Sequence, residues 1–123
     1  MKKLLIAAVL LFAFSANADH LDVIPSKLKA DCSLPEYLQI VNDFNEWGKG
    51  YGYQAEIAVP LYSHDVATLI WVGRSANAAT FGKAWDAWRD AQADPSSTPA
   101  KLNARFGACT EPSEQRRSYD TYP

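Results

Sequence analysis

Apolar and polar positions along this chain follow two periods, one typical of helices and one typical of strands. The clearest helical spacing begins after Ser33 and is carried by Tyr37, Leu38, Val41, Phe44 and Trp47. It predicts a helix over 34–47. Ser33 and Glu36 form a capping box, and Pro35 suits the first turn, where no N–H donor is needed. Gly48, Gly50 and Gly52 end the pattern.

The period changes to two over residues 53–61. One face of this segment carries Tyr53, Ala55, Ile57, Val59 and Leu61, and the other carries Gln54, Glu56, Ala58 and Pro60. This alternation predicts a strand with one apolar face, with Pro60 at an edge or bend. A polar connection over 62–67 leads to a second strand over 68–73. Because the connection is short, an antiparallel hairpin is favoured.

Two further segments complete the strand pattern. Residues 22–30 alternate loosely, which predicts a first strand with Val23, Leu28 and Ala30 facing inward and Pro25 near an edge or bulge. Residues 114–122 offer Tyr119 and Thr121 for a last strand.

Two helices are expected between the hairpin and the last strand. Ser75 or Asn77 can cap the first of them, whose apolar positions are Phe81, Ala84, Trp85, Trp88 and Ala91. Residues 94–97 end it. A short helix then begins at 98–99, carries Leu102 and Phe106, and closes near Cys109.

The predicted order is therefore strand, helix, strand, strand, helix, short helix, strand. This order fits an α+β fold, with a four-stranded antiparallel sheet and helices on one face, the split βαβ or ferredoxin-like plan. Both strand faces carry apolar side chains, since Ala58 and Leu69 or Ile70 cannot all lie beneath the same helices. We therefore expect a homodimer that forms through the uncovered sheet face.

Three stretches resemble the dimeric α/β-barrel superfamily: residues 34–61, the run Trp71-Val72-Gly73-Arg74-Ser75 with the helix after it, and residues 116–122. The likeness is closest to small exported uncharacterised members and to NIPSNAP-like domains. It implies a ligand cavity between the sheet and its helices. The superfamily includes cofactor-independent oxygenases, haem-binding and haem-degrading enzymes, lactone isomerases and members of no known activity.

The first eighteen residues have the pattern of a secretory signal peptide. Lys2 and Lys3 precede an apolar run over 4–14, and Ala16-Asn17-Ala18 is a small-x-small cleavage pattern. The run is shorter than the roughly 20 residues that span a bilayer. We therefore expect residues 19–123 to form one exported domain, periplasmic in the favoured interpretation and extracellular in the alternative.

Charge and cysteine usage narrow the function classes. After residue 18 the chain carries ten basic and fourteen acidic residues, and Arg116-Arg117 is its only adjacent basic pair, so we expect no nucleic-acid partner. No later segment is apolar enough to predict a membrane span. Cys32 and Cys109 predict one disulfide, worth about 4 kcal/mol in the chain-entropy model. Without a C-x-x-C or a zinc pattern, we expect neither a metal nor a cofactor.

Two side chains are weak catalytic candidates. His64 can bind haem iron or act as a base, although a histidine beside Asp65 in a polar connection is commonly just exposed. Glu56, in mid-strand, can act as an acid or base if its face lines a cavity. If that face meets solvent or a partner, Glu56 is a rim residue or forms an ion pair.

Four side chains are candidates for ligand binding. Arg74 lies between a strand and a helix N-terminus, a fair place for an anion, or it forms an ion pair with Glu56 or Asp86. Trp71, Phe81 and Trp85 are candidate walls of an aromatic pocket, with core packing as the alternative.

Three function hypotheses follow. The leading one is a binding protein for a small, partly apolar molecule in a sheet–helix cavity, with Arg74 and Glu56 orienting its polar end. The second is a cofactor-independent oxygenase or isomerase with Glu56 or His64 as its base, which requires one of them inside the cavity. The third is a structural or interaction protein without a ligand, which requires a filled interior.

Overall fold

The computed structural model describes residues 19–113 and 115–123. The predicted signal peptide, residues 1–18, lies outside the described residues. The elements in chain order are β1 (His20–Lys27), α1 (Leu34–Gly48), the short 3-10 helix η1 (Lys49–Tyr51), β2 (Gln54–Ala58), β3 (Thr68–Ser75), α2 (Ala78–Ala91), α3 (Thr98–Cys109) and β4 (Arg117–Asp120). This is the order of strands and main helices that the sequence predicts.

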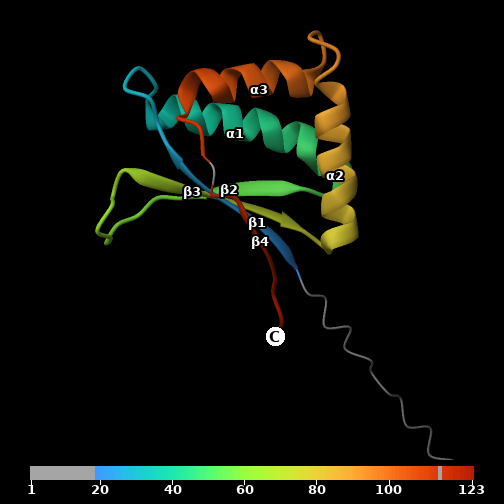
Figure 1. Cartoon of the computed structure of the whole chain (residues 1–123), viewed down its shortest axis with the longest axis horizontal. Helices are drawn as coiled ribbons and strands as arrows, with labels where there is room; N and C mark the ends of the chain where they lie inside the picture. The colour runs from blue at the N-terminus through green and yellow to red at the C-terminus, as the bar shows by residue number, and fades with distance from the viewer. Residues whose placement is uncertain (1–18, 114) are drawn as a thin grey trace, which may run out of the picture.

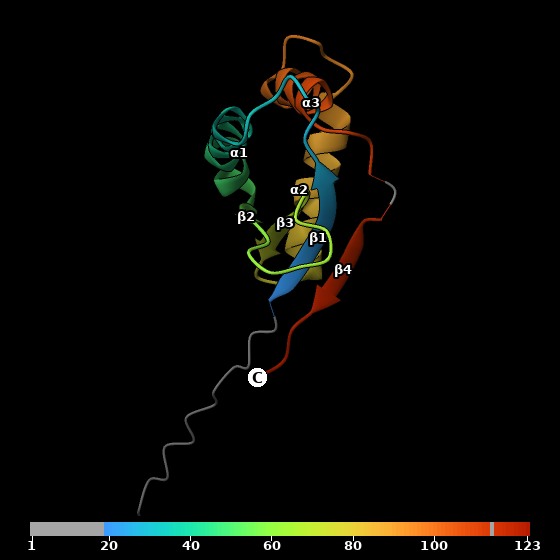
Figure 2. The same cartoon turned by 90° about the vertical axis from the view of Figure 1, so that its left-hand side faces the viewer.

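The strands form one antiparallel sheet with the order β2-β3-β1-β4. The helices lie on one side of it: α1 and α3 run side by side above the strands, and α2 stands at one end (Figure 1). The turned view shows β4 at the sheet edge, beside β1 (Figure 2). The predicted fold class, an α+β fold with a four-stranded antiparallel sheet of ferredoxin-like plan, is confirmed.

The helices begin where their capping residues predict. The Ser33 side chain accepts from the backbone N–H of Glu36, and the Glu36 carboxylate accepts from the Ser33 backbone N–H, so both halves of the capping box are present. Asn77, one of the two predicted caps, accepts from the Thr80 N–H at the start of α2. Each cap satisfies a donor that the first turn leaves without an intrahelical partner.

Two strand predictions need correction. The segment predicted as a strand to residue 61 ends at Ala58, and Leu61 is 94% exposed, because Pro60 cannot donate to a ladder. Of the three positions predicted to face inward in the first strand, Leu28 packs against the core, whereas Val23 lies on the face opposite to the buried Asp22 and Ala30 is exposed beyond the end of β1.

The predicted disulfide joins the ends of two helices. Cys32, just before α1, is bonded to Cys109, the last residue of α3, and their Cα atoms are 5.1 Å apart. Within the described part of the chain, no helix has both the length and the apolar character that crossing a bilayer requires.

The two faces of the sheet differ in what covers them. Beneath the helices, β1 presents alternate residues from His20 to Ser26, which pair with Ser75, Gly73, Trp71 and Leu69 of β3. The opposite face carries Leu21, Val23, Ile70 and Val72 at its centre. The described helices leave this second face uncovered (Figure 2).

Candidate functional site

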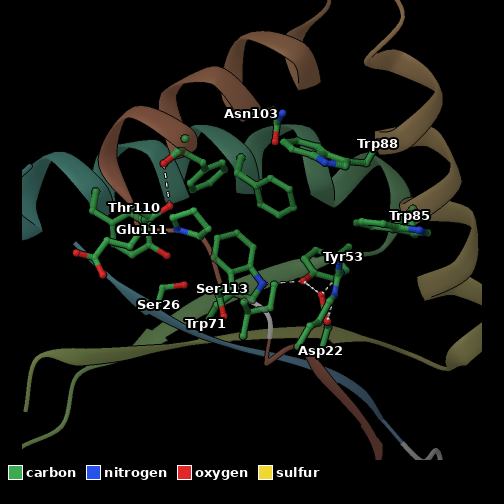
Figure 3. Close-up of a pocket in the computed structure, with 18 of the residues that line it drawn as sticks. Asp22, Ser26, Tyr53, Trp71, Trp85, Trp88, Asn103, Thr110, Glu111 and Ser113 are labelled. Atoms are coloured by element: carbon green, nitrogen blue, oxygen red, sulfur yellow. Dashed lines mark hydrogen bonds and ion pairs between the residues drawn. The ribbon is translucent and has the colours of Figure 1, made fainter. Parts of the chain in front are cut away.

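A cavity of about 460 Å³ lies between the sheet and the helices, open on one side. This volume falls within the roughly 300–1,000 Å³ range of small-molecule sites. Figure 3 shows its floor on the strands, with Trp71 near the middle, and its roof on α2 and α3, with Trp85, Trp88 and Asn103. The fold therefore leaves a ligand-sized space where a filled core would be the simpler outcome.

The cavity wall is mostly aromatic. Its aromatic lining residues are Tyr37, Phe44, Trp47, Tyr53, Trp71, Phe81, Trp85, Trp88 and Phe106, and they include all four tryptophans of the chain. The Phe44 ring centre lies 4.9 Å from that of Trp71 and 5.4 Å from that of Trp88, and both pairs meet edge to face. Such packing fixes the rings in place, so the wall is preformed.

One pole of this aromatic cavity is a buried carboxylate. The Asp22 side chain is 1% exposed, and its Oδ2 accepts from the Tyr53 hydroxyl at 2.8 Å (Figure 3). The Tyr53 oxygen in turn accepts from the Trp71 indole N–H at 2.7 Å. Burial of the phenol, followed by the Asp22 charge, raises the pKa of Tyr53 far above its ordinary value. Tyr53 therefore stays neutral and acts as a fixed donor to Asp22.

Arg116 supplies the charge that balances Asp22. Its Nε donates to Asp22 Oδ1 at 2.7 Å and its Nη2 donates to Oδ2 at 2.5 Å, a bidentate pair. The guanidinium carbon lies 4.2 Å from the Trp85 ring centre and 5.7 Å from that of Phe81. These cation–π contacts hold the guanidinium flat against the cavity wall.

Two glycines allow this arrangement. At Gly73, directly beside Asp22 in the β1–β3 register, a Cβ atom would overlap the Tyr53 hydroxyl, so only glycine leaves room for it. Gly52, with φ of 69°, adopts the left-handed conformation that ends η1 and directs the chain back toward the sheet at Tyr53.

The other end of the cavity carries a second set of polar groups. Ser26, Lys29, Thr110 and Glu111 line it, and Lys29 Nζ donates to the Gly107 carbonyl at 2.7 Å. The four ionisable Asp, Glu, Lys and Arg side chains among the lining residues are Asp22, Glu111, Lys29 and Arg116, so their formal charges cancel. The cavity thus combines a mostly aromatic wall with a few polar groups, and its lining carries no net formal charge.

The predicted site residues fall into two groups. Trp71, Phe81 and Trp85 line the cavity together. Arg74 and Glu56 do not: they lie on the uncovered face, where Arg74 Nη2 and Glu56 Oε1 are 3.1 Å apart and both side chains are at least half exposed. This is the ion pair that the sequence offers as the alternative to an anion site.

His64 lies in the exposed β2–β3 connection, away from the cavity lining. The oxygenase or isomerase hypothesis required His64 or Glu56 inside the cavity, and the structure places neither there. Among the described residues, no group of three or more His, Cys, Asp and Glu side chains is arranged to hold a metal ion.

Sequence reasoning missed the polar pole of the cavity. The alternation predicted for residues 22–30 places Val23 inward and therefore Asp22 on the other face, although an aspartate inside a strand is unusual enough to be a signal. Gly73 in the middle of β3 was a second signal, since a strand glycine often marks a close approach. Arg116 carried no local signal, because its partner lies 94 residues away.

No protein-family model matches the sequence, and no curated protein matches it. Solved structures do. A NIPSNAP family protein of unknown function from Agrobacterium tumefaciens has a TM-score of 0.57 at 11% identity, over 88% of this chain and 91% of its own. The hydroxynitrile lyase from Passiflora edulis has a TM-score of 0.54 at 15% identity, over 87% and 99%. A structural genomics protein, YJCS, has 0.51 at 12%, over 84% and 98%.

Identities this low establish a shared fold and no shared chemistry. The neighbours agree with the resemblance drawn from the sequence, which was closest to NIPSNAP-like domains. By its topology and its structural neighbours, this chain has a ferredoxin-like fold.

Proposed function

We propose that this chain is an exported binding protein that holds a small, flat, partly apolar molecule in the sheet–helix cavity. The observation that carries the proposal is the cavity itself: about 460 Å³ of space walled by aromatic rings, with a buried ion pair at one end. An apolar middle with a few fixed polar groups is the usual composition of a small-molecule site. The polar end of the ligand then meets Arg116 rather than Arg74 or Glu56.

Binding, rather than catalysis, suits the chemistry of the polar pole. Asp22 accepts two hydrogen bonds from Arg116 and one from Tyr53, so three of the roughly four acceptor positions of its carboxylate are taken. A general base must be within hydrogen-bond reach of the proton that it removes, with a free lone pair aimed at it. The hypothesis of a structural or interaction protein without a ligand requires a filled interior, and the cavity of about 460 Å³ counts against it.

A screen of flat aromatic probes tests this proposal by calorimetric titration, which is preferred to fluorescence because such probes absorb or emit light in the same range as the four cavity tryptophans. Naphthalene, indole and trans-cinnamate are suitable probes. Ala84 is 4% exposed and lines the cavity from α2, so Ala84→Leu extends into the space. Ala79→Leu, at an exposed position of the same helix, is the matched control. We expect weaker binding only in Ala84→Leu, and equal binding by both variants would contradict the site.

We further propose that two copies pair through the uncovered sheet face. Its centre carries Val23 and Val72, which are direct neighbours in the β1–β3 register. Around this centre lie charges of both signs, among them Glu56, Arg74 and Arg117. A face with an apolar centre and mixed charges can complement itself across a two-fold axis. Light scattering tests this: Val72→Lys is expected to be monomeric, and a monomeric unsubstituted chain would contradict pairing.

Export is the remaining part of the proposal. It is supported by the signal pattern over residues 1–18 and by the Cys32–Cys109 disulfide, which is typical of oxidising compartments. We expect the mature protein to begin at Asp19 and to reside in a periplasm, with the extracellular space as the alternative. Mass spectrometry of protein from fractionated cells decides between them.

A further inference from the structure

We propose that Arg116 recognises a carboxylate, so that the ligand class is flat aromatic monocarboxylic acids; this inference rests on the ligand-binding function proposed above. The guanidinium group has two edges that can bind a carboxylate in a bidentate manner. Asp22 occupies the edge formed by Nε and Nη2. The edge formed by Nη1 and the second Nη2 proton makes no hydrogen bond to any other residue that the structure describes.

The free edge belongs to a group that is held in a defined plane at the cavity wall. Arg116 lines the cavity, its side chain is 34% exposed, and its guanidinium lies against Trp85. The bidentate bond to Asp22 removes the remaining rotation of the guanidinium. A preorganised fork loses little entropy on binding, which favours a planar two-oxygen partner in the same plane.

The chemistry of this edge distinguishes a carboxylate from its nearest neutral analogue. A carboxylate places an acceptor oxygen opposite each N–H donor. A carboxamide places one acceptor and one NH₂ group there, so a donor faces a donor. The aromatic rings beside the guanidinium lower the local dielectric constant, which strengthens both the attraction and the mismatch.

The apolar part of the ligand is set by the rings next to Arg116. Phe81 and Trp85 flank the guanidinium, and Trp71 reaches the same pole through Tyr53. A ligand whose carboxylate meets Arg116 therefore places its adjoining atoms between these rings. A conjugated, planar acid fits this space better than a branched one, because stacking requires a flat face.

Calorimetric titration with trans-cinnamate and trans-cinnamamide tests the inference, because the two probes share one shape and differ in the group offered to Arg116. We expect the acid to bind at least about tenfold more tightly than the amide. Arg116→Lys keeps a cation beside Asp22 and removes the fork, so the preference is expected to fall to about threefold or less. Arg74→Lys, on the opposite face, is the matched control and should keep the full preference.

The outcomes separate this inference from the function on which it rests. If the amide binds as tightly as the acid, carboxylate recognition is wrong and the cavity remains a ligand site. If Arg116→Lys keeps the full preference while folding normally by circular dichroism, the role of Arg116 is wrong. If neither probe binds, and naphthalene and indole do not bind either, the proposed function fails with the inference.

Discussion

The Asp22–Arg116 pair gives the sharpest prediction about this molecule, because the two partners differ so much in burial. The Asp22 side chain is 1% exposed and that of Arg116 is 34% exposed. Arg116→Met therefore leaves a carboxylate buried without its cation, with only the Tyr53 hydroxyl as a donor. Removing one member of a buried pair costs about 3 to 5 kcal/mol. We expect Arg116→Met to lower the free energy of unfolding by about 3 kcal/mol.

The reciprocal change is expected to cost less. Asp22→Asn leaves the Arg116 cation, which can still be hydrated at its exposed part, so we expect a loss of about 1 to 2 kcal/mol. The double variant removes both charges together. Its loss should fall short of the sum of the two single losses by about 2 kcal/mol, which is the coupling between the groups.

Guanidinium unfolding with the disulfide intact, followed by tryptophan fluorescence and circular dichroism, measures these values. The exposed Asp86–Arg89 pair on α2 is the matched control, since its separation is similar at 3.0 Å but both side chains are more than half exposed. The cycle Asp86→Asn and Arg89→Met should show a coupling below about 1 kcal/mol. Equal couplings in the two cycles, or a loss below about 1 kcal/mol in Arg116→Met, would refute the reasoning.

Three further predictions concern stability. Gly73→Ala should lower the free energy of unfolding by more than about 2 kcal/mol, because a Cβ atom at this position would overlap the Tyr53 hydroxyl; chemical denaturation measures the loss. Burial raises the pKa of Tyr37 from 10.0 to about 12, so the stabilising effect of the neutral phenol is complete below about pH 10 and is lost as the pH rises toward 12. Across that interval the free energy of unfolding of the unsubstituted chain should fall by up to about 2.7 kcal/mol more than that of Tyr37→Phe, and equal falls would contradict this. Ser33→Ala removes a helix cap and should lower the free energy of unfolding by about 1 kcal/mol. Ser75→Ala removes a buried hydroxyl that has no hydrogen-bond partner among the described residues, and it should lower the same quantity by less than about 0.5 kcal/mol. The reverse order of these two losses would be inconsistent with the structure.

Local patterns predicted most of the fold because local physics forms those elements. The capping box at Ser33 and the cap at Asn77 act within one helical turn, so a sequence window contains the whole interaction. The β2–β3 hairpin and the disulfide also follow from short-range alternation and from a single possible cysteine pairing.

The polar pole of the cavity depends on long-range partners, which explains why the sequence predicted the aromatic wall but not the pole. Period-two reasoning places apolar residues inward, and it fails for Asp22 because Tyr53 and Arg116 satisfy the buried charge from distant segments. Conversely, Arg74 had a promising local position beside a helix start. Arg74 lies opposite Gln54 in the β2–β3 register, and its side chain reaches diagonally to Glu56 on the uncovered face, so its surroundings are those of an exposed ion pair.

The central claim is that the sheet–helix cavity binds a flat ligand, and the most direct test is a ¹H–¹⁵N spectrum recorded during titration with trans-cinnamate. The account predicts that the indole N–H signals of the four tryptophans shift and saturate together, while the side-chain Nε–H signal of Arg74 on the opposite face stays in place. Indole signals that do not move, while the Arg74 signal shifts, would contradict it.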